Sequence, residues 1–191
     1  MLLPLVLASA SPRRAELLQA AGIPFDVVPA DVDEQQHAGE DAGTYVQRLA
    51  AAKAAHVAGT HPGRAVLGAD TTVVVDGDVL GKPRDAAEAV AMLKRLSGRS
   101  HLVLTGVCLI GADGRTETSI ASTTVEFRPV TAAEIERYVA SGEPMDKAGA
   151  YAIQGGAGGF VTRIEGDYDN VVGLPVALIQ AMCRAMRIQV S

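Results

Sequence analysis

The chain has 191 residues, of which 48% are apolar, enough to bury one substantial core or two small lobes. Its formal net charge is -5, aromatic residues make up 4% and tryptophan is absent, so a generic nucleic-acid binder, usually basic and often equipped with aromatic stacking platforms, is disfavoured. Cys108 and Cys183 lie far apart in apolar surroundings, which favours buried thiols in a reducing compartment over a disulfide scaffold.

The first ten residues, MLLPLVLASA, combine an apolar run with an Ala-x-Ala sequence typical of a signal-peptide cleavage site. The run is short and no basic residue precedes it, so we interpret it as a buried first strand from about Leu3 to Ala8. No other segment approaches the length of a transmembrane span. We therefore expect a cytoplasmic protein with no membrane partner.

Short apolar runs alternate with helical patterns along the chain, which is typical of an α/β architecture. A helix is predicted over residues 12–21, with Gly22 and Pro24 as its stop signal. A short strand at 25–28 and an acidic loop lead to a second helix at 43–58 and a strand at 64–69 that stops at Asp70. The second helix carries an apolar stripe made of Val46, Leu49, Ala50, Lys53 and Val57.

Turn and capping signals organise the rest of the chain. Asp76-Gly77 predicts a hairpin between strands at 72–75 and 79–80. The chain then continues with a predicted helix at 85–96, strands at 102–110 and 116–127, and a helix capped by Thr131 and Glu134. After a glycine-rich turn we expect a strand at 160–164 and a last helix from about Pro175. Parallel units first and an antiparallel middle predict one mixed, elongated sheet flanked by helices. We expect a single domain over 1–191, with about 83–141 as a second lobe.

The stretch Ser9-Ala10-Ser11-Pro12-Arg13-Arg14 poses a problem of charge. Pro12 suits the first helical position and Ser11 the N-cap, yet two arginines occupy the first turn, where the helix dipole disfavours cations. The two arginines could simply be solvated surface cations. We favour a phosphate site in which helix N–H groups, serine hydroxyls and both guanidiniums converge on an anion just after a strand.

Asp70 follows an almost wholly apolar strand, where it is either an ordinary turn former or a metal ligand or general base. Lys53 lies on an apolar stripe, where lysine either snorkels to the surface or is buried with a partner. Asp33 and Glu34 could bind a divalent cation, although such loops are more often solvated. Lys82, in Gly81-Lys82-Pro83, lies in a loop and by itself does not indicate a function.

Other catalytic and binding motifs are missing from the sequence. The four histidines show no metal-ligand spacing with the cysteines, and no phosphate-binding Gly-x-x-x-x-Gly-Lys-Ser/Thr occurs. The glycines at 155, 156, 158 and 159 open no dinucleotide fingerprint and are interpreted as a flexible turn. The arginines, lysines and carboxylates together suit cleavage of a phosphate ester or anhydride, with cations holding phosphates and carboxylates holding Mg²⁺ or taking a proton from water.

In combination these residues resemble the Maf family, whose members are regarded as nucleoside triphosphate pyrophosphatases. The resemblance extends over essentially the whole chain. It rests on the following motifs: Ser9-Ala10-Ser11-Pro12-Arg13-Arg14, Asp33-Glu34, Ala52-Lys53-Ala54, Gly68-Ala69-Asp70-Thr71, Gly81-Lys82-Pro83, Ser97-Gly98, Asp146-Lys147-Ala148-Gly149-Ala150-Tyr151 and Ile153-Gln154-Gly155.

The resemblance implies a fold similar to that of inosine triphosphate pyrophosphatases, with two lobes and a central cleft. It also implies hydrolysis of a nucleoside triphosphate to the monophosphate and pyrophosphate with a divalent cation, Mg²⁺, Mn²⁺ or Co²⁺. Asp70 would be the proton acceptor, and the implied catalytic set is Asp70, Glu34, Lys53 and Lys82. The implied metal ligands are Glu34 and Asp70, and the implied substrate-binding residues are Ser9, Arg13, Arg14, Thr71 and Gln154.

Three of these positions, Arg13, Thr71 and Gln154, match the branch of the family that acts on dTTP and UTP, a preference that could extend to modified pyrimidine nucleotides. The amide of Gln154 offers both a donor and an acceptor for a pyrimidine edge. A non-catalytic nucleotide-binding regulator of septum formation and cell division is the alternative, but a pure binder needs no base. We further expect a homodimer and no stable nucleic-acid partner.

Overall fold

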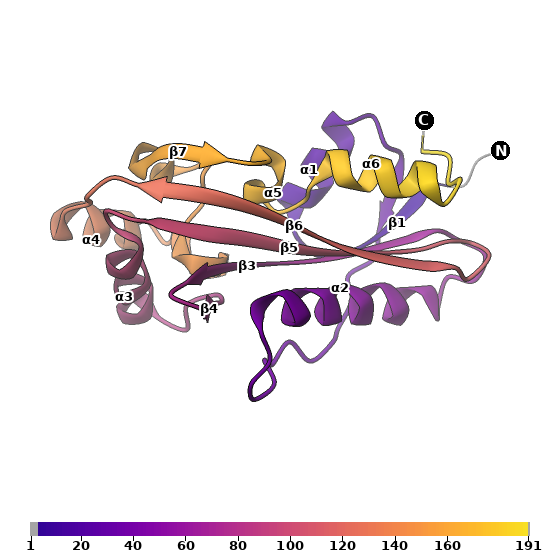
Figure 1. Cartoon of the computed structure of the whole chain (residues 1–191), viewed down its shortest axis with the longest axis horizontal. Helices are drawn as coiled ribbons and strands as arrows, with labels where there is room; N and C mark the ends of the chain where they lie inside the picture. The colour runs from indigo at the N-terminus through magenta and orange to yellow at the C-terminus, as the bar shows by residue number, and fades with distance from the viewer. Residues whose placement is uncertain (1–3, 191) are drawn as a thin grey trace. The chain divides into compact units, whose positions relative to one another are not determined.

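A mixed seven-stranded sheet organises the computed structural model, which describes residues 4–190 (Figure 1). The strand order is β2-β1-β3-β5-β6-β7, with β4 paired to β3. β1 runs parallel to β2 and β3, whereas β4 and β7 are antiparallel to β3 and β6. The strands are β1 (Leu5–Ala8), β2 (Phe25–Val27), β3 (Val66–Val75), β4 (Asp78–Leu80), β5 (Ser100–Ile110), β6 (Thr116–Phe127) and β7 (Val161–Glu165).

The helices flank this sheet, which confirms the predicted α/β class. They are α1 (Pro12–Ala20), α2 (Ala42–Ala58), α3 (Ala86–Leu96), α4 (Ala132–Ala140), α5 (Tyr168–Val172) and α6 (Val176–Ala185), with 3₁₀ turns η1 (Glu143–Asp146), η2 (Ala148–Ala150) and η3 (Gly156–Phe160). Both halves of the capping box at Thr131 and Glu134 are present. The sequence missed α5 and the 3₁₀ turns, and position 3 of the expected first strand lies outside the described residues.

The prediction that a strand stops at Asp70 is wrong, because β3 continues without a break from Val66 to Val75. β1 ends opposite Gly68, so Asp70 lies just beyond the part of β3 that pairs with β1. The β-branched run from Thr71 to Val75 favours extended backbone and carries the strand on to its hairpin with β4. Asp76 and Gly77 have positive φ angles there, as the two central positions of a type I′ turn require.

The chain divides into two compact units, residues 1–70, 105–121 and 173–191 in the first and residues 71–104 and 122–172 in the second. Strands β3, β5 and β6 contribute residues to both. The second lobe expected at 83–141 shares residues 83–104 and 122–141 with the second unit.

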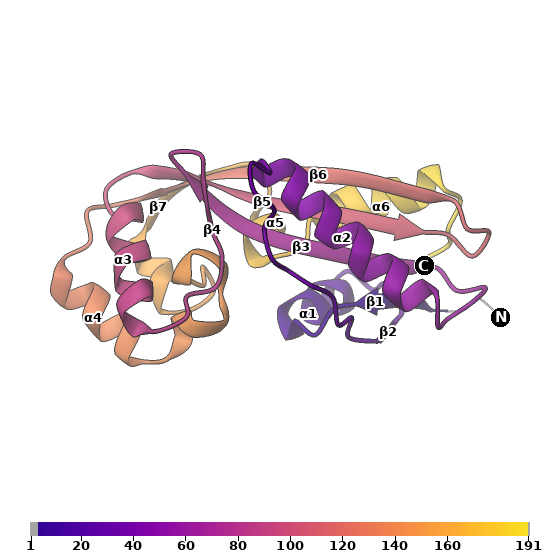
Figure 2. The ribbon, with the colours of Figure 1, turned by 90° about the horizontal axis from the view of Figure 1, so that it is seen from below.

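In the first unit α2 covers one face of the sheet, and α1 and α6 cover the other (Figures 1 and 2). The alternation along β1 accounts for this arrangement, since Leu5 and Leu7 join the cluster with α1 and α6, whereas Val6 and Ala8 join the cluster with α2. All residues of the α2 stripe predicted from the sequence are buried.

Two glycines bring α2 unusually close to the sheet. A Cβ added at Gly68 would lie 2.2 Å from the carbonyl oxygen of Ala50, and one at Gly106 would lie 2.3 Å from the carbonyl oxygen of Val46. Since no side chain fits at either position, the helix backbone rests directly on β3 and β5. This contact fixes the height of α2 above the strand that carries Asp70.

The second unit is built around aromatic side chains and the pair α3 and α4, which lie side by side (Figure 2). His101 is 3% exposed, and its Nε2 is hydrogen-bonded to the hydroxyl of Tyr151 at 2.8 Å. The rings of Phe127 and Tyr151 pack edge-on against the imidazole. Burial lowers the pKa of His101 to about 4, so the ring is neutral at physiological pH.

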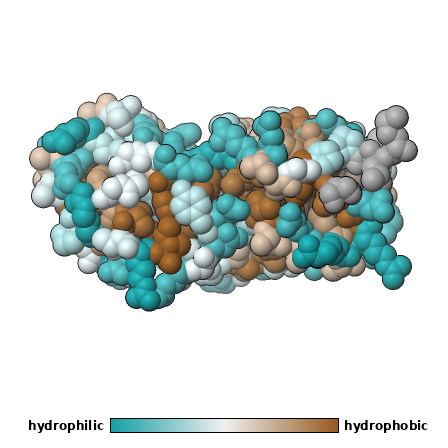
Figure 3. Space-filling model, turned by 90° about the horizontal axis from the view of Figure 1, so that it is seen from above, coloured by the Kyte–Doolittle hydropathy of each residue, from teal (hydrophilic) through white to brown (hydrophobic). Residues whose placement is uncertain are grey.

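Among residues 4–190, no helix is both long enough and apolar enough to cross a membrane. The face drawn in Figure 3 mixes hydrophilic and hydrophobic side chains.

Candidate functional site

The turn between β1 and α1 holds Arg14 through hydrogen bonds to other parts of the first unit. Arg14 is 8% exposed, and its Nε donates to the carbonyl oxygen of Gly173 at 2.8 Å. Its Nη1 donates to Ser9 Oγ at 3.1 Å and to the carbonyl oxygen of Ala69 at 2.9 Å. Burial lowers the pKa of the Arg14 guanidinium, while the negative charge of Asp70 opposes that shift. Arg14 is thus fixed in orientation between β1, β3 and the segment before α6.

Ser11 occupies the predicted N-cap position, but its side chain makes no capping hydrogen bond. Its main-chain N–H instead donates to Ser9 Oγ at 3.2 Å. The Ser9 hydroxyl therefore links the start of the turn to the buried arginine. Arg13, the second residue of α1, is half-buried.

The central feature of the first unit is an ammonium group between two carboxylates. Lys53 Nζ lies 2.7 Å from Asp70 Oδ1 and 2.5 Å from Glu34 Oε1. Lys53 and Asp70 are 7% and 8% exposed, whereas 46% of the Glu34 side chain is accessible. Lys53 is therefore buried with partners, and the snorkelling interpretation is wrong. Glu34 likewise belongs to this cluster through its carboxylate, although it remains half-open to solvent.

The packing of α2 on β3 places these groups opposite each other. Gly68 and Asp70 are two residues apart in an extended strand, so their side chains share a face. Gly68 admits the backbone of α2 at Ala50 and Ala54, and Lys53 extends from the same turn of the helix. The close helix therefore delivers the lysine to Asp70.

The loop that carries Glu34 is tied to α2 by two side chains that the sequence analysis did not single out. Tyr45 donates its hydroxyl to the carbonyl oxygen of Glu34 at 3.0 Å, and Arg48 Nη2 donates to that of Gln35 at 3.0 Å. Arg48 also holds Glu40 through two hydrogen bonds of 2.6 and 2.8 Å, which lower the pKa of Glu40 to about 2. Burial and the nearby Asp70 and Glu34 charges raise the pKa of Tyr45 to about 12.

The remaining predicted site residues, Thr71, Lys82 and Gln154, belong to the second unit. Thr71 is half-buried on β3, and Lys82 is exposed directly after Gly81, whose carbonyl oxygen accepts a hydrogen bond from the Gly149 N–H at 3.1 Å. Gln154 is exposed in the turn that leads into η3.

The glycines that follow Gln154 lie in a turn with a regular 3₁₀ conformation. Residues 156–160 form the 3₁₀ turn η3, in which Ala157 and Phe160 are buried. A Cβ at Gly158 would lie 2.8 Å from the carbonyl oxygen of Ile153, so the missing side chain permits a close backbone approach.

The two carboxylates suit a divalent cation that also binds phosphate. Among residues 4–190, no cluster of three or more His, Cys, Asp and Glu side chains is arranged to hold a metal ion. Glu34 and Asp70 each place an oxygen within 2.7 Å of one and the same nitrogen, so both can approach a single cation. Because Mg²⁺ usually takes one or two protein carboxylates and completes its shell with phosphate and water, this pair fits that binding mode better than a resident all-protein cage.

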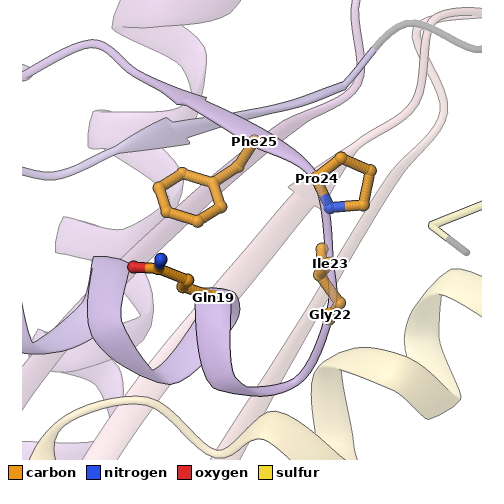
Figure 4. Close-up of a pocket in the computed structure, with 5 residues that line it drawn as sticks. All are labelled: Gln19, Gly22, Ile23, Pro24 and Phe25. Carbon is orange, nitrogen blue, oxygen red and sulfur yellow. The ribbon is translucent and has the colours of Figure 1, made fainter.

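A shallow, open pocket of about 460 Å³ lies elsewhere in the first unit, where α1 leads into β2 (Figure 4). It is lined by Gln19, Gly22, Ile23, Pro24 and Phe25. In Figure 4 the ring of Phe25 and the side chain of Gln19 face each other across it. None of the residues predicted from the sequence to act in catalysis or binding lines this pocket.

The fold and the charged cluster define an α/β protein in which a buried lysine lies between two carboxylates. The chain belongs to the family described as Maf-like protein, whose family model matches residues 4–186. A relative from Myxococcus xanthus (strain DK1622), named dTTP/UTP pyrophosphatase, is 58% identical over 172 residues, which cover 90% of this chain and 87% of the relative. A second relative, from Symbiobacterium thermophilum and also named dTTP/UTP pyrophosphatase, is 56% identical, and the match covers 90% of this chain and 88% of the relative.

The solved structure of the Staphylococcus aureus Ham1 protein aligns with this chain at a TM-score of 0.49 and 15% sequence identity. The alignment covers 96% of this chain and 100% of the Ham1 chain.

Proposed function

We propose that this protein is a nucleoside triphosphate pyrophosphatase that hydrolyses dTTP and UTP to the monophosphate and pyrophosphate. The observation that carries the proposal is the Lys53 ammonium between Asp70 and Glu34, next to the buried Arg14. The names of the relatives from Myxococcus and Symbiobacterium support the substrates.

In the proposed reaction Asp70 takes a proton from water as the water oxygen bonds to the α-phosphorus. The bond from that phosphorus to the bridging oxygen breaks, and pyrophosphate leaves with the electron pair. Lys53 keeps the Asp70 carboxylate oriented through its 2.7 Å hydrogen bond and, with Arg14, supplies positive charge where negative charge develops. Ser9 and Arg13 approach the phosphates from the β1–α1 turn.

Glu34 and Asp70 would hold the divalent cation that the family implies. When bound, the cation neutralises phosphate charge and favours departure of pyrophosphate. Lys82 belongs to the proposed catalytic set for the same electrostatic reason. The proposed roles of Arg13, Thr71 and Gln154 in selecting uracil or thymine rest on the family resemblance and on the paired donor and acceptor of the Gln154 amide.

We also propose a cytoplasmic location, supported by the buried free thiols of Cys108 and Cys183. Burial raises the pKa of both thiols to about 11, which makes them poor nucleophiles and leaves the chemistry to the carboxylates. The homodimer and the lack of a nucleic-acid partner stay predictions.

Pyrophosphate release from UTP, dTTP, CTP and GTP tests the proposal, with Mg²⁺, Mn²⁺ or Co²⁺ and with excess chelator. We expect UTP and dTTP to be preferred and the chelator to stop the reaction. Asp70→Asn should lower kcat by about 10²–10⁴-fold, the usual contribution of a general base. Asp31→Asn, an exposed carboxylate of the Glu34 loop, is the matched control and should keep its rate.

Unchanged turnover in the Asp70 variant would sink the assignment of the base, and equal rates on all four nucleotides would refute the proposed base preference. Tight nucleotide binding without any pyrophosphate release would favour the regulator instead.

A further inference from the structure

The segment around Gln154 is held by a hydrogen-bonded pair of side chains outside the residues to which the proposed function gives a role. The Tyr138 hydroxyl, on α4, donates to Glu143 Oε1 at 2.9 Å. The same hydroxyl oxygen accepts the main-chain N–H of Ala152 at 3.0 Å, and Glu143 Oε2 accepts that of Gly156 at 3.2 Å. Both attachment points lie two residues from Gln154, one on each side.

The glycines after Gln154 are shaped to this pair. A Cβ at Gly155 would lie 1.9 Å from Glu143 Oε1, and one at Gly156 would lie 3.1 Å from the ring of Tyr138. The missing side chains therefore let the backbone lie against the carboxylate and the ring.

Tyr138 is itself firmly placed. It is 6% exposed, and its ring packs edge-on against Phe160, the last residue of η3, with ring centroids 5.6 Å apart. The Glu143 N–H is 3.3 Å from Ser141 Oγ, and Lys147 Nζ donates to the Glu143 carbonyl oxygen at 2.8 Å. The backbone on both sides of Gln154 is thus held by Tyr138, whose ring is packed in place, and by Glu143, whose main chain is itself hydrogen-bonded.

We propose that Tyr138 and Glu143 are positioning residues that set base selectivity by fixing the backbone on either side of Gln154. This inference rests on the proposed function, in which the Gln154 amide pairs with a pyrimidine edge. An amide discriminates one ring edge from another only when its donor and acceptor are held in register, within about 0.5 Å and 10–20° for an effective site. Releasing the backbone lets the amide adjust to a wrong base as readily as to the right one.

The test compares kcat/KM for UTP and CTP, whose rings differ in a carbonyl versus an amino group at C4 and in a donor N–H versus an acceptor nitrogen at N3. Tyr138→Phe keeps the ring and removes the bridge to Ala152, and Glu143→Ala removes both acceptors. We expect the UTP-to-CTP ratio to fall by about tenfold or more in each, because a loosened site no longer leaves the wrong base unpaired. Inhibition by inorganic triphosphate, which has no base, should not change.

Two further variants separate positioning from general damage. Glu143→Gln keeps the shape and one acceptor oxygen and should restore most of the preference for UTP. Glu136→Ala removes an exposed carboxylate from the same helix, α4, and should leave both the ratio and the rates as in the wild type. If Glu143→Ala does not fold, Tyr138→Phe carries the test.

The outcomes distinguish this inference from the proposed function. A wild-type protein with equal kcat/KM for UTP and CTP overturns the proposed substrate and this inference with it. A wild-type preference that both folded variants retain overturns this inference alone. A ratio that falls together with weaker inhibition by inorganic triphosphate also overturns it, because the damage then extends beyond the base.

Discussion

Replacing Lys53 by methionine removes the cation from the centre of the charged cluster while roughly preserving the volume of the side chain. The Asp70 carboxylate, 8% exposed, then loses its hydrogen bond from the lysine. Glu34 loses a partner too, but 46% of its side chain is accessible and water replaces the lysine there. The penalty of the substitution therefore falls mainly on Asp70.

Removing one partner of a buried ion pair usually costs about 3–5 kcal/mol. The exposed contact with Glu34 adds about 0–1 kcal/mol, as surface ion pairs do. Arg14 lies close enough for its charge to interact with Asp70, which reduces the loss. We expect the free energy of unfolding to fall by about 3 kcal/mol, and Tm to fall by about 6–12 °C for a chain of this length.

Urea unfolding followed by circular dichroism at pH 7 measures this loss. A neutral side chain in place of Asp70 removes the buried charge that the lysine variant leaves unpaired. Adding Asp70→Asn to the lysine variant should recover part of the stability at pH 7. Lys94→Met, at an exposed position of α3, is the control. A lysine variant as stable as the wild type, or a deficit that Asp70→Asn does not reduce, would refute this account of the cluster.

Two other substitutions test the packing and the buried imidazole. Gly68→Ala should lower the free energy of unfolding by about 1–3 kcal/mol or more, because its Cβ would lie 2.2 Å from the Ala50 carbonyl oxygen. Gly59→Ala is the control, since a Cβ there would lie 3.6 Å from its nearest neighbours, and it should be close to neutral in the same denaturation assay. A mild effect at Gly68 would contradict the close contact. The pKa of His101 is about 4 in the folded protein and about 6.5 in the unfolded chain, so the unfolded chain binds more protons between these pH values. The free energy of unfolding should therefore not depend on His101 above pH 6.5. It should fall by about 3 kcal/mol between pH 6.5 and pH 4. His101→Phe should remove this contribution to the pH slope, and an unchanged slope would show that another group titrates there.

Local patterns predicted most of the secondary structure, because caps, turns and apolar periodicity are properties of neighbouring residues. The capping box at Thr131 and the turn at Asp76-Gly77 are confirmed for this reason. The prediction that a strand ends at Asp70 was wrong because the β-branched run from Thr71 to Val75 favours extended backbone and continues the strand. The pairing of Asp70 with Lys53, 17 residues earlier, is tertiary context that a scan of neighbouring residues does not detect.

The sequence indicated which residue types the candidate site contains better than it indicated which residues contact each other. The apolar stripe of α2 showed that Lys53 is anomalous, but its partners depend on how α2 packs on β3. The arginine turn suggested an external anion for Arg14, whereas one of its acceptors is the carbonyl oxygen of Gly173, 159 residues later in the chain. Propensity and helix-dipole arguments have no access to such a partner. The role of Gln154 came from the family resemblance and stays a prediction.

The contact of α2 with Gly68 and Gly106 has a mechanical consequence for the first unit. Val46, Ala50 and Ala54 lie on successive turns of the helix, and each rests on a glycine of the sheet. A helix seated by its backbone at three successive turns cannot slide or rotate without opening voids in a closely packed core. We therefore expect Lys53 and Asp70 to keep their relative positions. We expect any adjustment on nucleotide binding within this unit to fall to the segment bearing Glu34, which is joined to α2 by side-chain hydrogen bonds that can break and re-form singly.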